Sequence, residues 1–148
     1  MHEPILWIFT GEYEFLDNFY PSEMIIDSVR YPTVEHFFQS QKMLLKKDAV
    51  EVAKAKSPAD AKVLGNNLTM RDDWADVRYD VMLRGVREKF KAFPELAKRL
   101  IETEDVYIEE GNIWHDNIWG NCICPECREV RGKNWLGEIL MKVREEVK

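Results

Sequence analysis

The sequence predicts an α+β domain that is dominated by helices and contains one small antiparallel sheet. Three observations lead to this class. Apolar residues recur at helical spacing over most of the chain from residue 33 onward. Two short β-prone runs flank a two-residue turn. No internal repeat or linker divides the 148 residues, a length that is usual for one domain. We therefore expect residues 1–148 to form a single domain.

The N-terminal half contains the expected sheet and the first two helices. Residues 5–9 form a strand-like run, and the runs at 24–26 and 29–31 form a hairpin around a tight turn at 27–28. Thr33 is a typical N-cap and opens a helix that we expect to reach about Lys47. Ser57 and Pro58 open a second helix, because proline is favoured at the first helical position. Gly65 is expected to end it.

The C-terminal half is predicted to hold three more helices and a long loop. Asp72 or Asp73 caps a helix that continues to about Phe90, and Pro94 opens the next one. Residues 106–108 form a short strand, and residues 109–132 are irregular but rich in Trp, His, Asp, Asn and Cys. Such long loops are usually functional or disordered, and two tryptophans argue against disorder. The last helix carries one apolar stripe, formed by Leu136, Ile139, Leu140, Val143 and Val147.

Composition excludes several classes of protein. The formal net charge of -6 disfavours broad binding to duplex nucleic acid, which requires a basic face. No apolar run is long enough to span a membrane, and the N-terminus lacks the basic start of a secretory signal. Three cysteines within six residues do not resemble a secreted disulfide framework. We therefore expect a cytoplasmic protein.

The helix after Thr33 carries the first candidate site. Glu35, Gln39 and Lys42 are spaced i, i+4, i+7 and form one polar row, which can share a substrate. Glu35 suits a base or a cation stabiliser, because the helix dipole favours its anionic form. Lys42 can become a nucleophile where desolvation lowers its pKa. The alternative is an exposed helix face with a weak contact between Glu35 and Lys42.

Two further segments carry candidate binding residues. In residues 16–22, Asn18 offers a donor and an acceptor, and Phe19 and Tyr20 can flank a ring; the alternative is a tight turn with two core aromatics. In residues 110–120, Trp119 can stack on a heterocycle and Asp116 can orient a water or hold a ribose hydroxyl. Gly120 would let the backbone approach a ligand closely. The alternative there is a loop held by aromatic packing and local Asx hydrogen bonds.

The cysteines follow a Cys-x-Cys-x-x-Cys pattern at Cys122, Cys124 and Cys127, with His115 upstream. Three thiolates and one imidazole would complete a tetrahedral zinc site, which would be structural because four protein ligands leave no open position. The spacing differs from paired Cys-x-x-Cys knuckles, so packed or reduced cysteines are the alternative.

Taken in order, these segments resemble the NADAR, or YbiA-like, family over nearly the whole chain. The matching stretches are residues 16–22, 33–39 with Lys42, 57–58 with 61–62 and Gly65, Trp74, Met82, 89–90, 110–120, and the C-terminal set Gly132, Asn134, 136–137, 140–141 and Arg144. The cysteine pattern is similar to one recurrent version of the family.

The resemblance implies an N-glycosidase that acts on ribosylamino-pyrimidine 5′-phosphates of early riboflavin biosynthesis. Relatives that remove ADP-ribose from modified guanine bases suggest a second substrate, a nucleoside or a base in nucleic acid. A sensor that binds ADP-ribose or NAD metabolites without turnover is a third interpretation. The expected partner is a small phosphorylated nucleotide-like molecule, and no cofactor is required beyond the possible structural zinc.

Two positions depart from the family pattern. Asp17 stands where a serine is expected, and Asn66 stands where an arginine is common. If that arginine normally binds a phosphate, this chain must use another cation, and the candidates are Lys62, Arg71 and Arg144.

Overall fold

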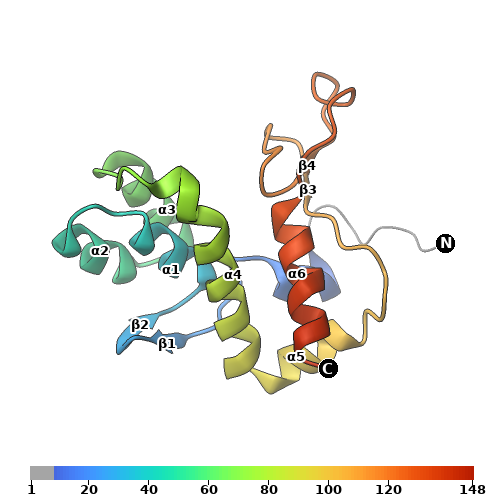
Figure 1. The fold of residues 1–148 in the computed structure, drawn as a ribbon, viewed down its shortest axis with the longest axis horizontal. Coiled ribbons are helices and arrows are strands. Elements are labelled where there is room, and N and C mark those ends of the chain that lie inside the picture. The colour runs from blue at the N-terminus through green and yellow to red at the C-terminus, as the bar shows by residue number, and fades with distance from the viewer. Residues whose placement is uncertain (1–8) are drawn as a thin grey trace. The chain divides into compact units, whose positions relative to one another are not determined.

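The computed structural model describes residues 9–148, which divide into two compact units. The central unit is Asn18–Phe93, and the terminal unit combines the chain up to Asp17 with Pro94–Lys148. Most of the regular secondary structure in both units is helical (Figure 1). The central unit also contains a two-stranded antiparallel sheet, so the predicted α+β class is confirmed. Of the strand expected at residues 5–9, residues 5–8 lie outside the described part of the chain. None of the helices in the described part is both long and apolar enough to cross a membrane.

The central unit begins with the predicted hairpin. Strands β1 (Met24–Ile26) and β2 (Val29–Tyr31) pair antiparallel, with Ile26 opposite Val29. The two turn residues, Asp27 and Ser28, have φ angles of 51° and 69°. Two successive positive φ angles are the signature of a type I′ turn, whose twist matches that of the flanking strands.

Helix α1 (Val34–Gln41) begins where the sequence predicted but ends earlier than expected. The Thr33 hydroxyl accepts a hydrogen bond from the His36 amide, which confirms the N-cap. The helix does not reach Lys47, because the backbone after Gln41 pairs with a distant segment instead. The Leu44 amide donates to the Thr69 carbonyl (3.0 Å), and the Lys42 carbonyl accepts from the Arg71 amide (2.9 Å). A separate helix that the sequence did not predict, α2 (Lys46–Ala53), follows.

Helix α3 (Pro58–Asn67) starts as predicted, with the Ser57 hydroxyl accepting from the Asp60 amide. It does not end at Gly65, which lies inside the helix for a packing reason described below. Helix α4 (Trp74–Ala92) follows the predicted N-cap Asp73. Helix α1 contacts α2, α3 and α4, and it is therefore the central element of this unit (Figure 1).

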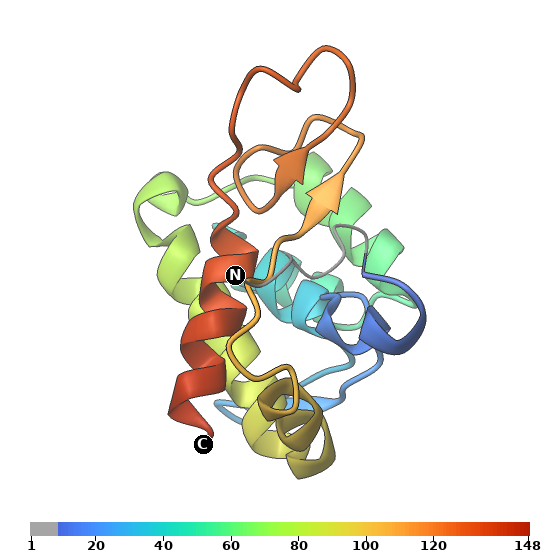
Figure 2. The ribbon, with the colours of Figure 1, turned by 90° about the vertical axis from the view of Figure 1, so that its right-hand side faces the viewer.

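The terminal unit contains a 3-10 helix, η1 (Gly11–Leu16), and helices α5 (Pro94–Ile101) and α6 (Trp135–Glu146). The predicted apolar stripe of α6 is buried except at its last member, Val147. The strand expected at residues 106–108 is reduced to a single β-bridge residue, Ile108, which is fully buried. Two short strands that were not predicted, β3 (Gly111–Asn112) and β4 (Asn121–Cys122), pair in parallel near the N-terminal end of α6 (Figure 2).

Candidate functional site

Helix α1 carries Glu35, Gln39 and Lys42 in the interior of the central unit. Glu35 is 7% exposed and Gln39 is 5% exposed, and Lys42 is partly buried. The helix is buried on almost all sides, so the alternative of a solvent-exposed polar face is wrong. The reason is tertiary, since three other helices cover α1. Placing a carboxylate in such an interior is costly unless it is paired, and this cost is typical of functional positions.

Gln39 is held against Glu35 from the side of α3. Its Nε2 donates to the Glu35 carboxylate over 2.7 Å. Its Oε1 packs against Gly65, where a Cβ atom would lie only 2.0 Å from that oxygen. This contact accounts for the glycine inside α3, since a larger residue there would displace the end of the Gln39 side chain. The Gln39 Oε1 atom is buried and has no hydrogen-bond partner in the described part of the chain. A buried acceptor of this kind can receive a hydroxyl from a ligand or a water.

Lys42 lies one turn beyond Gln39, at the C-cap of α1. Its ammonium group donates to the Asn66 side-chain oxygen over 3.1 Å. Burial lowers the pKa of Lys42 below its usual value, and the nearby Glu35 carboxylate partly offsets this effect. A lowered pKa increases the neutral amine fraction, which is the form that attacks a carbonyl carbon. Asn66, noted above as a departure from the family pattern, is thus the hydrogen-bond partner of the candidate nucleophile.

The second predicted segment meets the first at the start of α1. The Asn18 carbonyl accepts from the Glu35 amide (3.2 Å), and the Asn18 side chain donates to the Met82 sulfur (3.4 Å). Phe19 is 37% exposed and Tyr20 is partly exposed, so the alternative that both are core aromatics does not hold. Both rings are therefore partly exposed to solvent.

The third predicted segment lies in the terminal unit and is organised by its own side chains. One carboxylate oxygen of Asp116 accepts from the amides of Ile118 and Trp119, each over 3.0 Å. Gly120 has a structural role, because a Cβ there would lie 2.0 Å from the Glu110 carbonyl oxygen. These contacts are the Asx-type loop that was the alternative for this segment. These hydrogen bonds use one carboxylate oxygen of Asp116, so a contact between Asp116 and a substrate would use the other oxygen.

Trp119 and Trp135 form the aromatic part of this loop. Their ring centroids are 5.5 Å apart with an interplanar angle of 77°, an edge-to-face pair. Trp119 is only partly buried, so the pair supports its ring without enclosing it. A ring braced in this way is suited to stacking on a heterocycle.

Arg144 is placed in the core of the terminal unit. It is 5% exposed, and its Nη1 donates to the Thr103 hydroxyl (2.9 Å) and to the Val106 carbonyl (2.8 Å). Burial lowers the pKa of its guanidinium, and the acidic neighbours Glu145 and Asp105 oppose this effect. These bonds connect α6 to the segment after α5, which is a structural use of the side chain.

The other two candidate phosphate ligands lie in the central unit. Arg71 forms a bidentate ion pair with Asp73, with N–O distances of 2.6 Å and 3.0 Å. Lys62 is exposed on α3, one turn before Asn66 and therefore on the same face of the helix. Lys62 is accordingly the most accessible of the three cations.

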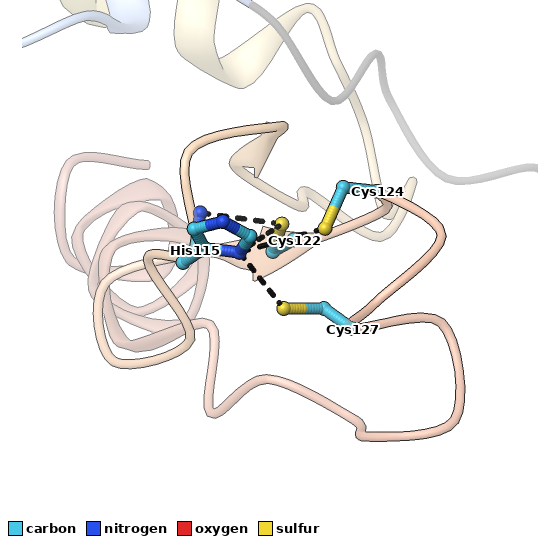
Figure 3. A group of neighbouring side chains, drawn as sticks. All are labelled: His115, Cys122, Cys124 and Cys127. Atoms are coloured by element: carbon cyan, nitrogen blue, oxygen red, sulfur yellow. Dashed lines mark hydrogen bonds between the residues drawn. The ribbon is translucent and has the colours of Figure 1, made fainter.

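The three cysteines and His115 form one cluster in the terminal unit (Figure 3). One potential ligand atom from each residue lies within 4.8 Å of the other three. Burial raises the pKa of the Cys122 thiol, but hydrogen bonds from the backbone N–H groups of Cys124 and His115 lower it by more. The net result is a pKa of about 7. The pKa of the Cys127 thiol is raised, first by burial and then by the neighbouring thiols. The grouping is compatible with the predicted metal site.

Sequence reasoning missed His36 and Lys89 among the buried polar residues of the central unit. His36 is almost fully buried; its Nε2 lies 3.0 Å from the Ala55 carbonyl and its Nδ1 lies 2.8 Å from the Thr33 hydroxyl. Lys89 is 1% exposed, and its ammonium lies 5.6 Å from the centre of the Tyr20 ring. A lysine inside the apolar stripe of α4 was the available signal for Lys89. His36 followed Thr33 by three residues, which signalled a cap but not burial.

Comparison with known proteins gives the following matches. The family model of the NADAR domain matches residues 7–148. A riboflavin biosynthesis protein of Vibrio vulnificus is 35% identical over 150 residues, which cover 99% of this chain but only 39% of that protein. The N-glycosidase YbiA of Escherichia coli is 32% identical over 140 residues, covering 93% of this chain and 84% of YbiA. The NMR structure of E. coli YbiA matches with a TM-score of 0.83 at 30% identity, over 99% of this chain and 86% of that one.

Proposed function

Since this chain belongs to the NADAR domain family, we propose that it hydrolyses the bond between ribose C1′ and the exocyclic amine of a ribosylamino-pyrimidine 5′-phosphate. The general class follows from relatives named as N-glycosidases: the chain is a hydrolase acting on N-glycosyl bonds. The choice of substrate is supported by two relatives named as riboflavin biosynthesis proteins, in Vibrio vulnificus and in maize.

One observation in the structure carries the proposal: a buried carboxylate and a partly buried lysine lie on one helix. Glu35 is held by Gln39, and Lys42 is held by Asn66. Because the carboxylate is paired and oriented, it can accept and return a proton without a change of position. Because burial lowers the pKa of the amine, it can act as a nucleophile. Simple binding of a nucleotide does not require both groups.

The proposed reaction begins with opening of the ribose ring: the exocyclic nitrogen donates its lone pair to C1′, the C1′–O4′ bond breaks, and O4′ takes a proton from solvent. The neutral Lys42 amine attacks C1′ of the resulting iminium, forms a C–N bond and passes its extra proton to the Glu35 carboxylate. The bond between C1′ and the exocyclic nitrogen then breaks, and the base leaves with the proton that Glu35 returns. Water adds to the lysine Schiff base and gives its proton to Glu35; Glu35 returns that proton to the lysine nitrogen, the bond between C1′ and this nitrogen breaks, and the sugar is released as its aldehyde. In a simpler path, water attacks C1′ directly, Glu35 is the base and Lys42 is a charged anchor.

The residues of the other segments are proposed to bind the substrate. Phe19 and Tyr20 provide rings beside the heterocycle, and Lys62 provides a cation for the 5′-phosphate. Trp119 and Asp116 belong to the terminal unit, and a stacking role for Trp119 and a role for Asp116 in holding a sugar hydroxyl or a developing positive charge stay predictions from the sequence. Gln39 keeps its proposed place in the substrate-binding set, beside the Glu35 carboxylate that it holds.

The experiment is to incubate the protein with the ribosylamino-pyrimidine 5′-phosphate and, separately, with ADP-ribosylated guanosine, and to follow release of the base by chromatography. Glu35→Gln should lower turnover about 10²–10⁴-fold, or roughly 3–5 kcal/mol of barrier. Glu51→Gln, an exposed change on α2, is the matched control and should keep full activity. A loss of less than about tenfold in Glu35→Gln would refute its role in proton transfer.

The two arms of the experiment distinguish the substrates. If base is released only from ADP-ribosylated guanosine, the substrate is a modified purine and the proposed pyrimidine substrate is wrong. Release from neither, by a folded protein that binds ADP-ribose, would indicate a sensor without turnover. Borohydride trapping of a covalent adduct that is lost in Lys42→Ala would select the Schiff-base path. Full activity of Lys42→Ala would remove both roles of this lysine.

A further inference from the structure

One group of side chains in the terminal unit has no part in the proposed reaction. His115 comes from the turn after β3, Cys122 ends β4, and Cys124 and Cys127 lie in the loop that follows (Figure 3). The geometry points to a tetrahedral Zn²⁺ site formed by these four residues, with a structural role in holding the loop of residues 113–131.

The distances within the cluster fit such an ion. With Zn–S bonds of about 2.3 Å and a Zn–N bond of about 2.0–2.1 Å, a regular tetrahedron separates the nitrogen from each sulfur by about 3.6 Å. In the structure, His115 Nδ1 lies 3.3 Å from the Cys127 sulfur, 3.5 Å from the Cys124 sulfur and 4.0 Å from the Cys122 sulfur. The three nitrogen–sulfur distances are thus close to those between the ligand atoms of a tetrahedral zinc site.

Hydrogen bonding alone does not explain this arrangement. A neutral imidazole nitrogen carries either one proton or one lone pair, so Nδ1 can form one good hydrogen bond. Here it faces three sulfur atoms at once. A cation placed among the four atoms would satisfy all of them, and it would offset the charge of the thiolates.

The surrounding backbone is already arranged for these ligands. The Asn112 side-chain oxygen accepts from the amides of Trp114 and Asp116, which fixes the turn that carries His115. His115 has a φ of 68°, a costly conformation for a residue with a side chain, and in it the His115 amide donates to the Cys122 sulfur over 3.3 Å. Amide donors to sulfur stabilise the thiolate that binds a metal.

Much of the apolar surface of this loop is exposed, which gives the ion a function. Large apolar side chains of this segment are exposed, with Ile113 at 59%, Trp114 at 56% and Val130 at 56%. A segment that buries so little apolar surface requires another constraint to stay folded, and a structural zinc supplies it. Four protein ligands leave no open coordination position, so the ion does not take part in chemistry as a Lewis acid.

The chemistry of the ligands selects the metal. Three thiolates with one imidazole in a tetrahedral arrangement favour Zn²⁺ over the hard cations Mg²⁺ and Ca²⁺. The other ring nitrogen of His115, Nε2, lies 4.0 Å from the Glu126 carboxylate. A carboxylate on the far side of a ligating histidine is a recurrent way to orient the ring.

The test is metal analysis of the full chain purified without chelator, followed by Co²⁺ exchange. We expect about one zinc per chain, and Co²⁺ spectra with the intense visible bands of a tetrahedral centre and thiolate charge-transfer bands. Cys124→Ser and Cys127→Ser change partly exposed side chains and should remove most of the zinc. Glu129→Gln, an exposed change in the same loop, is the matched control and should retain it. A metal-free protein that takes up no added Zn²⁺, or a variant pair that keeps full zinc, would overturn the site.

Hydrogen exchange tests the structural role separately from the site. Removal of zinc by a chelator should increase amide exchange in residues 113–131, while α1 and α4 in the central unit keep their protection. If zinc is bound and its removal leaves exchange in this loop unchanged, the structural role is refuted. Because neither readout uses activity, the outcome does not depend on the proposed glycosidase function.

Discussion

Replacing Gly65 by alanine tests the packing that holds Gln39 against Glu35. In an ordinary helix interior, glycine is less favourable than alanine by about 0.8–1.0 kcal/mol, so the substitution should stabilise the protein. Here the new Cβ would lie 2.0 Å from the Gln39 Oε1 and 2.9 Å from its Cδ. Gln39 must therefore move, although it is buried between two helices. The structure therefore predicts that Gly65→Ala lowers the free energy of unfolding, whereas helix propensity alone predicts that it raises it.

The magnitude follows from what Gln39 loses. Overfilling a packed interior costs about 1–3 kcal/mol. Loss of a hydrogen bond to a charged group costs about 1.5–3 kcal/mol. The two costs overlap, because one displacement produces both, so we take about 2–4 kcal/mol together and subtract about 1 kcal/mol for propensity. Gly65→Ala should thus lower the free energy of unfolding by about 1–3 kcal/mol.

The assay is urea unfolding of four proteins: wild type, Gly65→Ala, Gln39→Ala and the double variant. In the Gln39→Ala background only the Cβ of residue 39 remains, at 3.1 Å, so the clash largely disappears. The second substitution should then be neutral or stabilising, and the cycle should give a coupling energy above about 1 kcal/mol. Val63→Ala and Val63→Gly, at an exposed position of α3, measure the propensity difference in the same helix.

The reasoning is refuted if Gly65→Ala stabilises the wild type by the difference measured at Val63. That result would mean that Gln39 moves at no cost and that Gly65 does not position it. Additive substitutions in the cycle would lead to the same conclusion.

Three other predictions concern binding and pH. Trp119→Ala should weaken substrate binding about 5–150-fold, the scale of one stacked base, as measured by titration; unchanged affinity in a folded variant would assign the ring to packing alone. Lys62→Ala should raise the KM of the 5′-phosphorylated substrate but not that of its dephosphorylated form, and an equal effect on both would exclude a phosphate contact. Burial lowers the pKa of His36 below 6.5, so between the two pKa values the unfolded chain binds a proton at His36 and the folded chain does not. The free energy of unfolding should therefore fall as the pH drops below about 6.5 and level off below the folded pKa, and His36→Gln should flatten this slope in urea titrations; an equal slope in both proteins would contradict the assignment.

Local chemistry alone determined a large part of the fold. The positive-φ turn at Asp27 and Ser28, the cap at Thr33 and the proline start at Pro58 all depend on residues within a few positions of one another. Such interactions can be read from a sequence, because turns and caps use the conformational preferences of single residues. The candidate residues of α1 were found in the same way, from their helical spacing.

The ends of helices were decided by contacts that are distant in the sequence. Helix α1 stops at Gln41 because the following backbone pairs with residues 69–71, and α3 continues through Gly65 because that glycine makes room for Gln39. A glycine reads as a helix end when only its backbone freedom is considered. The neighbour that requires its missing side chain lies on another helix, and nothing local indicates it.

The sequence by itself determined which residue types can carry chemistry and in what order they occur. It could not determine their environment, since burial and proximity come from elements that meet only in the folded chain. The polar row that begins on α1 became a buried carboxylate and a partly buried lysine with a lowered pKa, and Arg144, a candidate phosphate ligand, became a core residue. Three cysteines with unusual spacing became a four-ligand cluster only when the turn after β3 placed His115 among them. The physical reason is the same in each case: spacing along one element is a local property, whereas desolvation and coordination depend on atoms supplied by other parts of the chain.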